Sequence, residues 1–289
     1  MSLDNLSLPC DLNGRGPTVV LVHAPEIGGG REEWSVLAPL LAAAGFGTVA
    51  CDLPGFGDAP PEPRRYGADD MIAGLAGLLD ELGIEPCHLV ARGLAVGYAA
   101  AVAAAQPERV ATLTAVAPLG LHPPRIRPDL FEQFTAADVG RARYEELAAT
   151  DNLRDWLCSE VYEDPSRVIA ELVAGLHQRA LRPGAEYVFG SLAAGWLSRE
   201  LRDDWVALTQ PLLLLWGESC EDPPLDEAED YLMPLRRDAP VLRIGGRPVG
   251  VWKRSVTYKT FAGARQRPHF EQPAEVAEVL LRHLARGAG

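Results

Sequence analysis

The chain has 289 residues, of which 47% are hydrophobic and 23% are charged, and its net charge is -13. This length and composition are typical of a globular protein with one large domain or two small ones. The negative charge argues against binding to nucleic acids or anionic membranes, because both need clustered lysines and arginines. The N-terminus lacks the layout of a signal peptide, and no run of about 18 apolar residues occurs, so we expect a cytoplasmic protein.

The cysteines give no sign of a metal site or a disulfide framework. Five of them are scattered along the chain without paired metal-site spacing, and Cys51 and Cys87 lie in apolar, strand-like runs. We therefore expect reduced, mostly buried thiols, and neither a metal nor a cofactor. The abundance of alanine, glycine, arginine and proline, with little lysine, resembles a bacterial chain of high coding GC content.

Apolar runs of strand length alternate with helical periodicity over the first 120 residues. Strands are predicted at residues 18–23, 47–51, 87–91 and 110–117, and helices at residues 33–44, 69–82 and 94–106. A further strand is predicted at residues 211–216. This alternation predicts an α/β fold with a doubly wound, mostly parallel sheet, whose functional loops lie at the carboxyl ends of the strands.

The pattern changes between residues 121 and 204, where helical stretches rich in aromatic residues replace the apolar strand runs. We predict an inserted helical cap over residues 121–204 and a core formed by residues 1–120 and 205–289. Tyr187 and Trp196 in the cap are candidate substrate contacts, although such aromatic residues more often pack between helices. Residues 241–261 are predicted to form a β-hairpin insertion before the last strand of the core.

The strand at residues 87–91 leads into a turn that reads Ala91-Arg92-Gly93-Leu94-Ala95. A strand, a small-residue turn and a helix form the context of the G-x-S-x-G nucleophile motif, and Gly93 occupies the serine position. Glycine has no side-chain atom that can attack a carbonyl, so no acyl-enzyme is expected here. Gly93 would instead leave room for substrate, with the Leu94 N–H as a hydrogen-bond donor.

Several motifs together resemble the α/β-hydrolase superfamily, from about Val19 to the last helix. They include the elbow at Gly93, the turn at residues 52–57 (DLPGFG) and the loop at residues 263–273 (GARQRPHFEQP). The resemblance implies the α/β-hydrolase fold with a helical cap. The family's histidine, acid and oxyanion-loop positions, like the serine position at the elbow, lack the residues of the catalytic pattern.

The family's histidine position is Gln266, whose side chain cannot accept a proton at neutral pH. Its acid position is Cys220, and its oxyanion loop reads His23-Ala24-Pro25, in which Pro25 has no N–H to donate. Loss of a single triad member costs up to ~10⁶-fold in turnover. The resemblance therefore predicts a member of the superfamily without the Ser/Asp/His triad.

The sequence suggests candidate site residues at these positions. The candidates for catalysis are Arg92, Gln266 and the backbone N–H of Leu94, and those for substrate binding are His23, Pro25, Gly93, Cys220, Tyr187 and Trp196. Simpler alternatives stay open: Arg92 packing against neighbouring loops, a structural role for His23 and His269, and a Cys220 thiol without a cationic neighbour to activate it.

These residues predict an enzyme that works by positioning and hydrogen bonding without a covalent intermediate. The expected reaction is an intramolecular cyclisation, C–C bond formation, isomerisation or elimination. The resemblance suggests a bulky, polycyclic natural-product intermediate as the substrate. The alternative is a catalytically inactive binding or scaffold protein. The expected partner is a small molecule, and the oligomeric state stays open, with a homodimer as one option.

Overall fold

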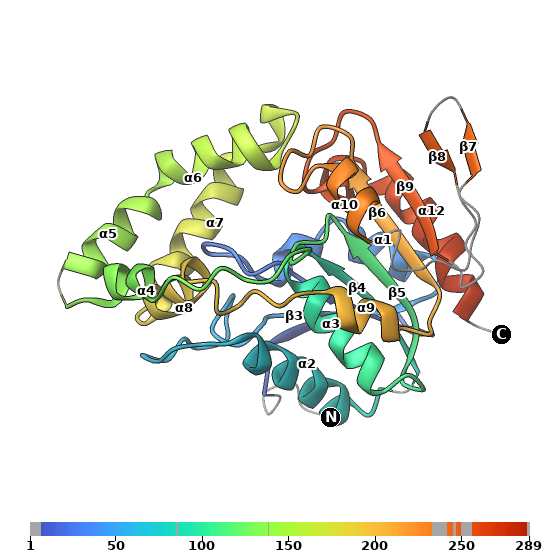
Figure 1. Cartoon of the computed structure of the whole chain (residues 1–289), viewed down its shortest axis with the longest axis horizontal. Coiled ribbons are helices and arrows are strands. Elements are labelled where there is room, and N and C mark those ends of the chain that lie inside the picture. The colour runs from blue at the N-terminus through green and yellow to red at the C-terminus, as the bar shows by residue number, and fades with distance from the viewer. Residues whose placement is uncertain are drawn as a thin grey trace.

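A seven-stranded sheet forms the centre of the molecule in the computed structural model, which describes residues 7–84, 86–137, 139–232, 242–244, 247–249 and 256–287 (Figure 1). The strand order is β1-β3-β2-β4-β5-β6-β9. The strands are β1 (Cys10–Asn13), β2 (Thr18–Val22), β3 (Gly47–Cys51), β4 (Cys87–Arg92), β5 (Val110–Val116), β6 (Leu212–Gly217) and β9 (Val256–Phe261). Only β1 runs antiparallel to its neighbour, so the predicted mostly parallel α/β sheet is confirmed for the described strands.

The central strands are apolar on both faces, because helices cover the sheet from both sides. Val20 and Val22 of β2 belong to one core cluster, while Val19 and Leu21 belong to the other. Alternate residues of a strand point to opposite faces, so a continuous apolar run is what a doubly covered sheet requires.

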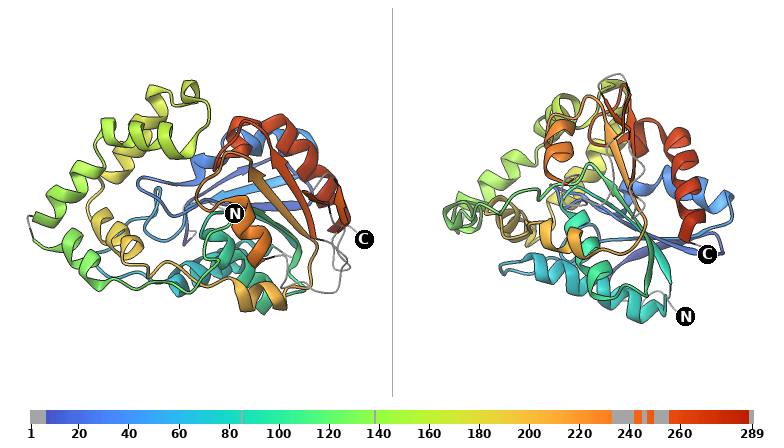
Figure 2. Two further views of the ribbon diagram at one scale, coloured as in Figure 1. Left: turned by 45° about the horizontal axis from the view of Figure 1, so that its top comes forward. Right: turned by 45° about the vertical axis from the view of Figure 1, so that its right-hand side comes forward.

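One face of the sheet packs against α2 (Ala68–Leu82), α3 (Ala95–Ala105) and α9 (Arg202–Ala207), and the other against α1 (Leu37–Ala43) and α12 (Pro273–Leu284) (Figures 1 and 2). The predicted helix at residues 33–44 is divided into the 3₁₀ turn η2 (Arg31–Trp34) and α1. Pro39 explains the break. It has no N–H to donate to the carbonyl of Ser35, so it is tolerated only in the first turn of α1.

Five helices lie beyond the strand ends, apart from those that cover the sheet (Figures 1 and 2). These cap helices are α4 (Pro128–Thr135), α5 (Val139–Leu147), α6 (Thr150–Trp156), α7 (Ala170–Ala180) and α8 (Ala185–Ala193), with the π-helical turn η3 (Leu157–Val161) and the 3₁₀ turn η4 (Pro165–Arg167) between α6 and α7. They have two small apolar clusters of their own. The exact limits of a separate cap domain stay a prediction.

The remaining elements lie in the last quarter of the chain. They are α10 (Leu225–Tyr231), β7 (Leu242–Ile244), β8 (Arg247–Val249), α11 (Pro268–Glu271) and η6 (Ala285–Gly287). β7 and β8 pair antiparallel within the segment 241–261 that was predicted as a hairpin insertion, but its residues 256–261 form β9, the last strand of the core. Residues 241, 245–246 and 250–255 of that segment lie outside the described residues. Within the described ranges, none of the helices is long and apolar enough to cross a membrane.

Candidate functional site

The candidate site lies at the carboxyl ends of β2 and β4, the point at which the strand order in the sheet reverses. β2 lies between β3 and β4, so the connections that follow β2 and β4 lead to opposite sides. Such a switch point leaves a crevice beyond the strand ends, where α/β sheets usually bind their ligands. The loop at residues 23–30 and the turn at Gly93 meet there.

The turn after β4 has the geometry of a nucleophile elbow. Gly93 has φ +56°, its N–H donates to the carbonyl of Val116 at 3.0 Å, and its own carbonyl accepts from Leu119 at 3.1 Å. A Cβ atom at this position would lie 3.2 Å from the Cβ of Ala24. Leu94 precedes α3, so its N–H belongs to the helix start, where N–H groups have no partner within the helix.

His23 ties the loop after β2 to the loop after β3. The backbone N–H of Leu53 donates to Nε2 of His23 at 3.0 Å, which leaves the proton on Nδ1, 2.8 Å from the carbonyl of Ala24. Burial lowers the pKa of His23, so the ring is neutral at pH 7. Pro25 is buried directly after this pair. This bonding pattern favours the structural role for His23.

Arg92 is buried in a group of charged side chains instead of facing open space. Its side chain is 3% exposed, and its Nη2 donates to Oε2 of Glu26 at 2.6 Å and to Oε2 of Glu33 at 3.3 Å, while Nε bonds to the second oxygen of Glu33. Arg267 pairs with the other oxygen of Glu26 and donates to the hydroxyl of Tyr162 at 3.0 Å. We call Glu26, Glu33, Arg92 and Arg267 the buried ion network.

The environment of this network shifts the pKa values of its members. Burial alone would raise the pKa of Glu33, but Arg92, together with His269, lowers it to about 2. The Nε2 of His269 lies 3.2 Å from Glu33, and its ring packs against Trp34 at 4.4 Å. Burial lowers the pKa of His269, and burial also lowers that of Arg267 to about 10. Glu33 is therefore an anion held between Arg92 and a neutral histidine.

A cavity of about 340 Å³ lies between the cap helices and the loop after β2. Its apolar walls are formed by Ile27, Leu147, Leu153, Trp156, Phe189 and Leu192. The polar lining residues are Glu26 and Asn152. We call it the cap cavity, and its volume and apolar walls match those of small-molecule sites, which occupy roughly 300–1,000 Å³.

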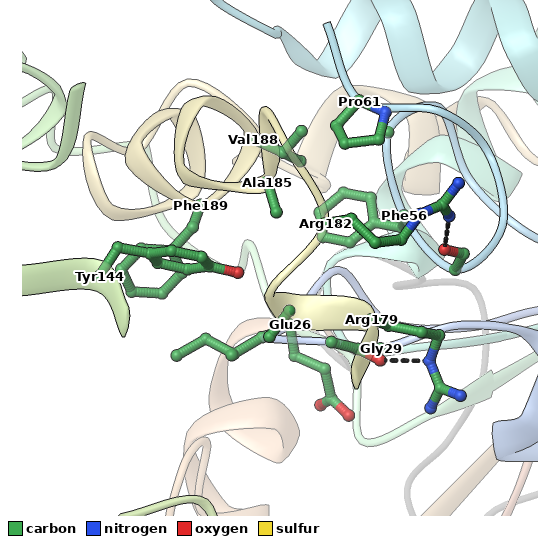
Figure 3. A pocket seen from close by; sticks show the side chains of 15 residues that line it. Glu26, Gly29, Phe56, Pro61, Tyr144, Arg179, Arg182, Ala185, Val188 and Phe189 are labelled. Atoms are coloured by element: carbon green, nitrogen blue, oxygen red, sulfur yellow. Dashed lines mark hydrogen bonds between the residues drawn. The ribbon is translucent and has the colours of Figure 1, made fainter. Parts of the chain in front are cut away.

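A much smaller cavity of about 20 Å³ adjoins Glu26 (Figure 3). Figure 3 shows Glu26 at its edge, with Tyr144 and Phe189 on one side and Arg179 and Arg182 on the other. The space suffices for about one water molecule. Glu26, Ile27 and Phe189 line both this water-sized cavity and the cap cavity.

Gln266 lines a separate polar cavity of about 310 Å³ near the ends of β6 and β9. The other residues that line it are Ser159, Glu160, Ser219, Glu221, Asp222 and Arg265. Cys220 is buried beside it, and burial raises the pKa of its thiol to about 11. The described residues include no group of three or more His, Cys, Asp or Glu side chains placed to hold a metal ion.

The two cap aromatics predicted to contact substrate pack against a third ring. Trp196 lies 5.0 Å and Tyr187 6.2 Å from Phe131, measured between ring centroids. Within the described part of the chain, neither lines the three cavities above. Their role in substrate binding therefore stays a prediction without support from a cavity.

The structure also shows residues that the sequence analysis missed. Glu26 is 66 residues from Arg92 and 241 residues from Arg267, so no local pattern indicates their pairing. Trp156 lines the cap cavity, but nothing in the sequence distinguishes it from the other aromatic residues of the cap segment. The one usable signal was the position of Glu26 and Glu33 around the glycine-rich loop that follows β2, since functional residues gather at strand ends.

Several curated proteins are similar to this chain. It is 29% identical over 221 residues to a pimeloyl-[acyl-carrier protein] methyl ester esterase of Aeromonas salmonicida, covering 73% of this chain and 80% of the esterase. It is 38% identical over 108 residues to 2-hydroxy-6-oxononadienedioate/2-hydroxy-6-oxononatrienedioate hydrolase 2 of Pseudomonas putida, covering 36% of this chain and 37% of that protein. A dihydrolipoyllysine-residue acetyltransferase component of the acetoin cleaving system of Pseudomonas putida is 28% identical over 72% of this chain.

The chain spans about half or less of the length of the first relatives it matches: 53% of that acetyltransferase component and 32% of epoxide hydrolase 2 of Siraitia grosvenorii. Among solved structures, 2-hydroxy-6-oxo-6-phenylhexa-2,4-dienoate hydrolase of Rhodococcus sp. strain RHA1 matches with a TM-score of 0.73 at 20% identity, covering 96% of this chain and 94% of that one. This similarity confirms the fold.

The prediction of a non-hydrolytic enzyme for cyclisation, C–C bond formation or isomerisation is wrong, and so is the exclusion of an esterase or other hydrolase. Most of the relatives above are hydrolases or esterases, so they point to hydrolysis. Gly93 and Gln266 exclude a serine nucleophile and a histidine base only at those two positions, and other groups can still carry out hydrolysis. The model of the alpha/beta hydrolase family matches residues 19–279, and the chain belongs to that family.

Proposed function

We propose that the protein is a hydrolase of small, largely apolar substrates in which the carboxylate of Glu26 activates the attacking water. The observation that carries this proposal is the position of Glu26, which borders both the cap cavity and the water-sized cavity. A substrate in the first and a water in the second would both lie beside Glu26. The hydrolases among the relatives support the choice of reaction.

The elbow explains why another group would have to activate the nucleophile. Gly93 offers no side chain for attack, and Gln266 offers no base. Water can take the nucleophile's role if a carboxylate accepts its proton. The 2.6 Å bond from Nη2 of Arg92 ties Glu26 to the residue that precedes Gly93 in the chain.

The proposed reaction is the addition of water to an ester carbonyl. The water oxygen forms a bond to the carbonyl carbon while one water proton passes to Glu26. The C–O bond to the alcohol then breaks, and the proton on Glu26 passes to the departing alkoxide, which releases acid and alcohol. The esterase relative supports an ester as the substrate.

Arg92 and Arg267 act as positioning residues in this proposal. Their side chains are each 3% exposed, so they hold Glu26 from behind, one on each oxygen, without reaching the cap cavity. Removing either guanidinium would free the carboxylate to rotate. A misplaced base loses most of its effect, because proton transfer needs hydrogen-bond contact with the water.

The test measures hydrolysis of a series of neutral esters with apolar acyl chains by the purified protein. The Glu26→Gln variant keeps the size and hydrogen-bonding capacity of the side chain but removes the base, and its kcat should fall by about 10²–10⁴-fold. Glu160→Gln, in the polar cavity, is the matched control and should keep the wild-type rate. Equal rates for Glu26→Gln and wild type would remove Glu26 from the mechanism.

A further inference from the structure

We infer that the cap cavity selects neutral or positively charged apolar compounds with a hydrogen-bond donor at one end, and rejects carboxylates. The inference concerns binding and rests on the proposed function only in taking the cap cavity as the substrate site. It names the class of molecule that the cavity recognises, which neither the fold nor the similarity to hydrolases specifies.

The lining of the cap cavity presents a carboxylate and no cationic group. Among the described lining residues, Glu26 is the one with an ionisable side chain, and Asn152 is the other polar one. The guanidinium groups of Arg92 and Arg267 lie behind Glu26 with 3% of each side chain exposed. A ligand headgroup at this end therefore meets Glu26 before either guanidinium group.

The oxygens of Glu26 can still accept bonds from a ligand. Each oxygen accepts from one arginine, Oε2 from Arg92 and Oε1 from Arg267, and 11% of the side chain is exposed. An ionised carboxylate has about four acceptor sites. An ammonium, hydroxyl or amide N–H can fill a remaining site. A carboxylate ligand cannot, because it has no proton to donate.

The charge of an anionic ligand would also be poorly compensated. The apolar walls reduce the local dielectric, which strengthens repulsion between like charges at short range. The buried ion network contains two carboxylates and two arginines, so its positive charges are already matched. A carboxylate ligand would add an unmatched anion beside Glu26.

Two further features favour cations. Trp156 lines the same cavity, and the face of an indole ring attracts ammonium groups. The chain as a whole has a net charge of -13, so its field attracts cations and repels anions during approach. Both effects act in the same direction as Glu26.

The experiment compares three probes that share one apolar body: 4-phenylbutylamine, 4-phenylbutan-1-ol and 4-phenylbutyrate. Their dissociation constants are measured by titration calorimetry at pH 7.5. The amine should bind about tenfold or more tightly than the carboxylate, with the alcohol between them. Equal or tighter binding of the carboxylate, or no binding of the amine, would overturn the inference.

Two variants and one control variant test whether the selectivity arises in the cap cavity. Glu26→Gln should bring the amine and the carboxylate to within about threefold, because the side chain becomes neutral, whereas Glu160→Gln in the polar cavity should change nothing. Leu192→Trp should weaken all three probes by filling the cap cavity without changing its charge. If Glu26→Gln does not fold, the order of the probes in the wild type and the effect of Leu192→Trp still decide the inference.

The outcome is separable from that of the proposed function, because binding is measured without turnover. Amine selectivity in a protein that hydrolyses no ester would uphold the cavity's specificity and reject the mechanism. Ester hydrolysis that depends on Glu26, combined with equal binding of amine and carboxylate, would uphold the mechanism and reject the cavity's specificity.

Discussion

Replacing Glu33 with glutamine should destabilise the protein by about 3–5 kcal/mol, the usual cost of breaking a buried ion pair from one side. Glu33 contacts Arg92 through both oxygens, lies 3.2 Å from Nε2 of His269 and accepts the N–H of Ala24 at 3.1 Å. Glutamine keeps the shape but removes the charge. Arg92 then shares Glu26 with Arg267, and the network is left with an unmatched positive charge in a buried place.

The lowered pKa of Glu33 arises from the same contacts with Arg92 and His269 and corresponds to a stabilisation of similar size. Its value falls from 4.5 to about 2 on folding, which corresponds to about 3 kcal/mol. A lowered carboxyl pKa contributes stability above the unfolded value of 4.5, and the contribution is lost as the pH falls towards 2. The difference in unfolding free energy between wild type and Glu33→Gln should therefore reach its full size at pH 7 and be smaller at pH 3.

Urea unfolding followed by circular dichroism at pH 7 and pH 3 measures both effects. The exposed Glu146→Gln is the control and should stay within about 0.5 kcal/mol of wild type. A loss below about 1 kcal/mol for Glu33→Gln at pH 7, or a gap that does not narrow at pH 3, would refute a buried, ionised Glu33.

Three further predictions address the elbow, the core and the thiols. Gly93→Ala should cost about 1–2 kcal/mol in urea unfolding, because φ at residue 93 is +56° and the new Cβ would lie 3.2 Å from that of Ala24. Burial lowers the pKa of His283 to about 4, so between pH 6.5 and pH 4 the unfolded chain binds a proton at this residue and the folded protein does not. The free energy of unfolding should therefore fall over this pH range. In His283→Leu the urea midpoint should depend less on pH. Iodoacetamide at pH 7.5 should modify the half-buried Cys158 before Cys220, whose thiol pKa burial raises to about 11, as peptide mass spectrometry would show; faster labelling of Cys220 would contradict its burial.

Local sequence patterns predict most of the core fold. The apolar runs at β2 and β4 are continuous because both faces of each strand are covered, and this signal is present in the residues themselves. The predicted helix at residues 33–44 differs from the structure because the effect of Pro39 on its start was not considered. Alternating strands and helices thus specify the sheet, while single residues adjust the ends of its elements.

The candidate site was less predictable, because it depends on pairs of residues far apart in the chain. Arg92 is the last residue of β4, one residue beyond the predicted strand end, and its charge is paired with Glu33 and Glu26. Gln266 lines a polar cavity other than the one at Glu26. Sequence position indicates which strand end a residue follows, whereas the partner of a buried charge is decided by tertiary packing.

Chemical rescue tests the central claim most directly. Glu26→Ala removes the carboxylate and leaves a gap that formate can enter, held by Arg92 and Arg267. Ester hydrolysis should fall by about 10²–10⁴-fold in this variant and should recover with increasing formate, but not with chloride at equal ionic strength. Hydrolysis that survives in Glu26→Ala, or that formate does not restore in a folded variant, would contradict water activation by Glu26.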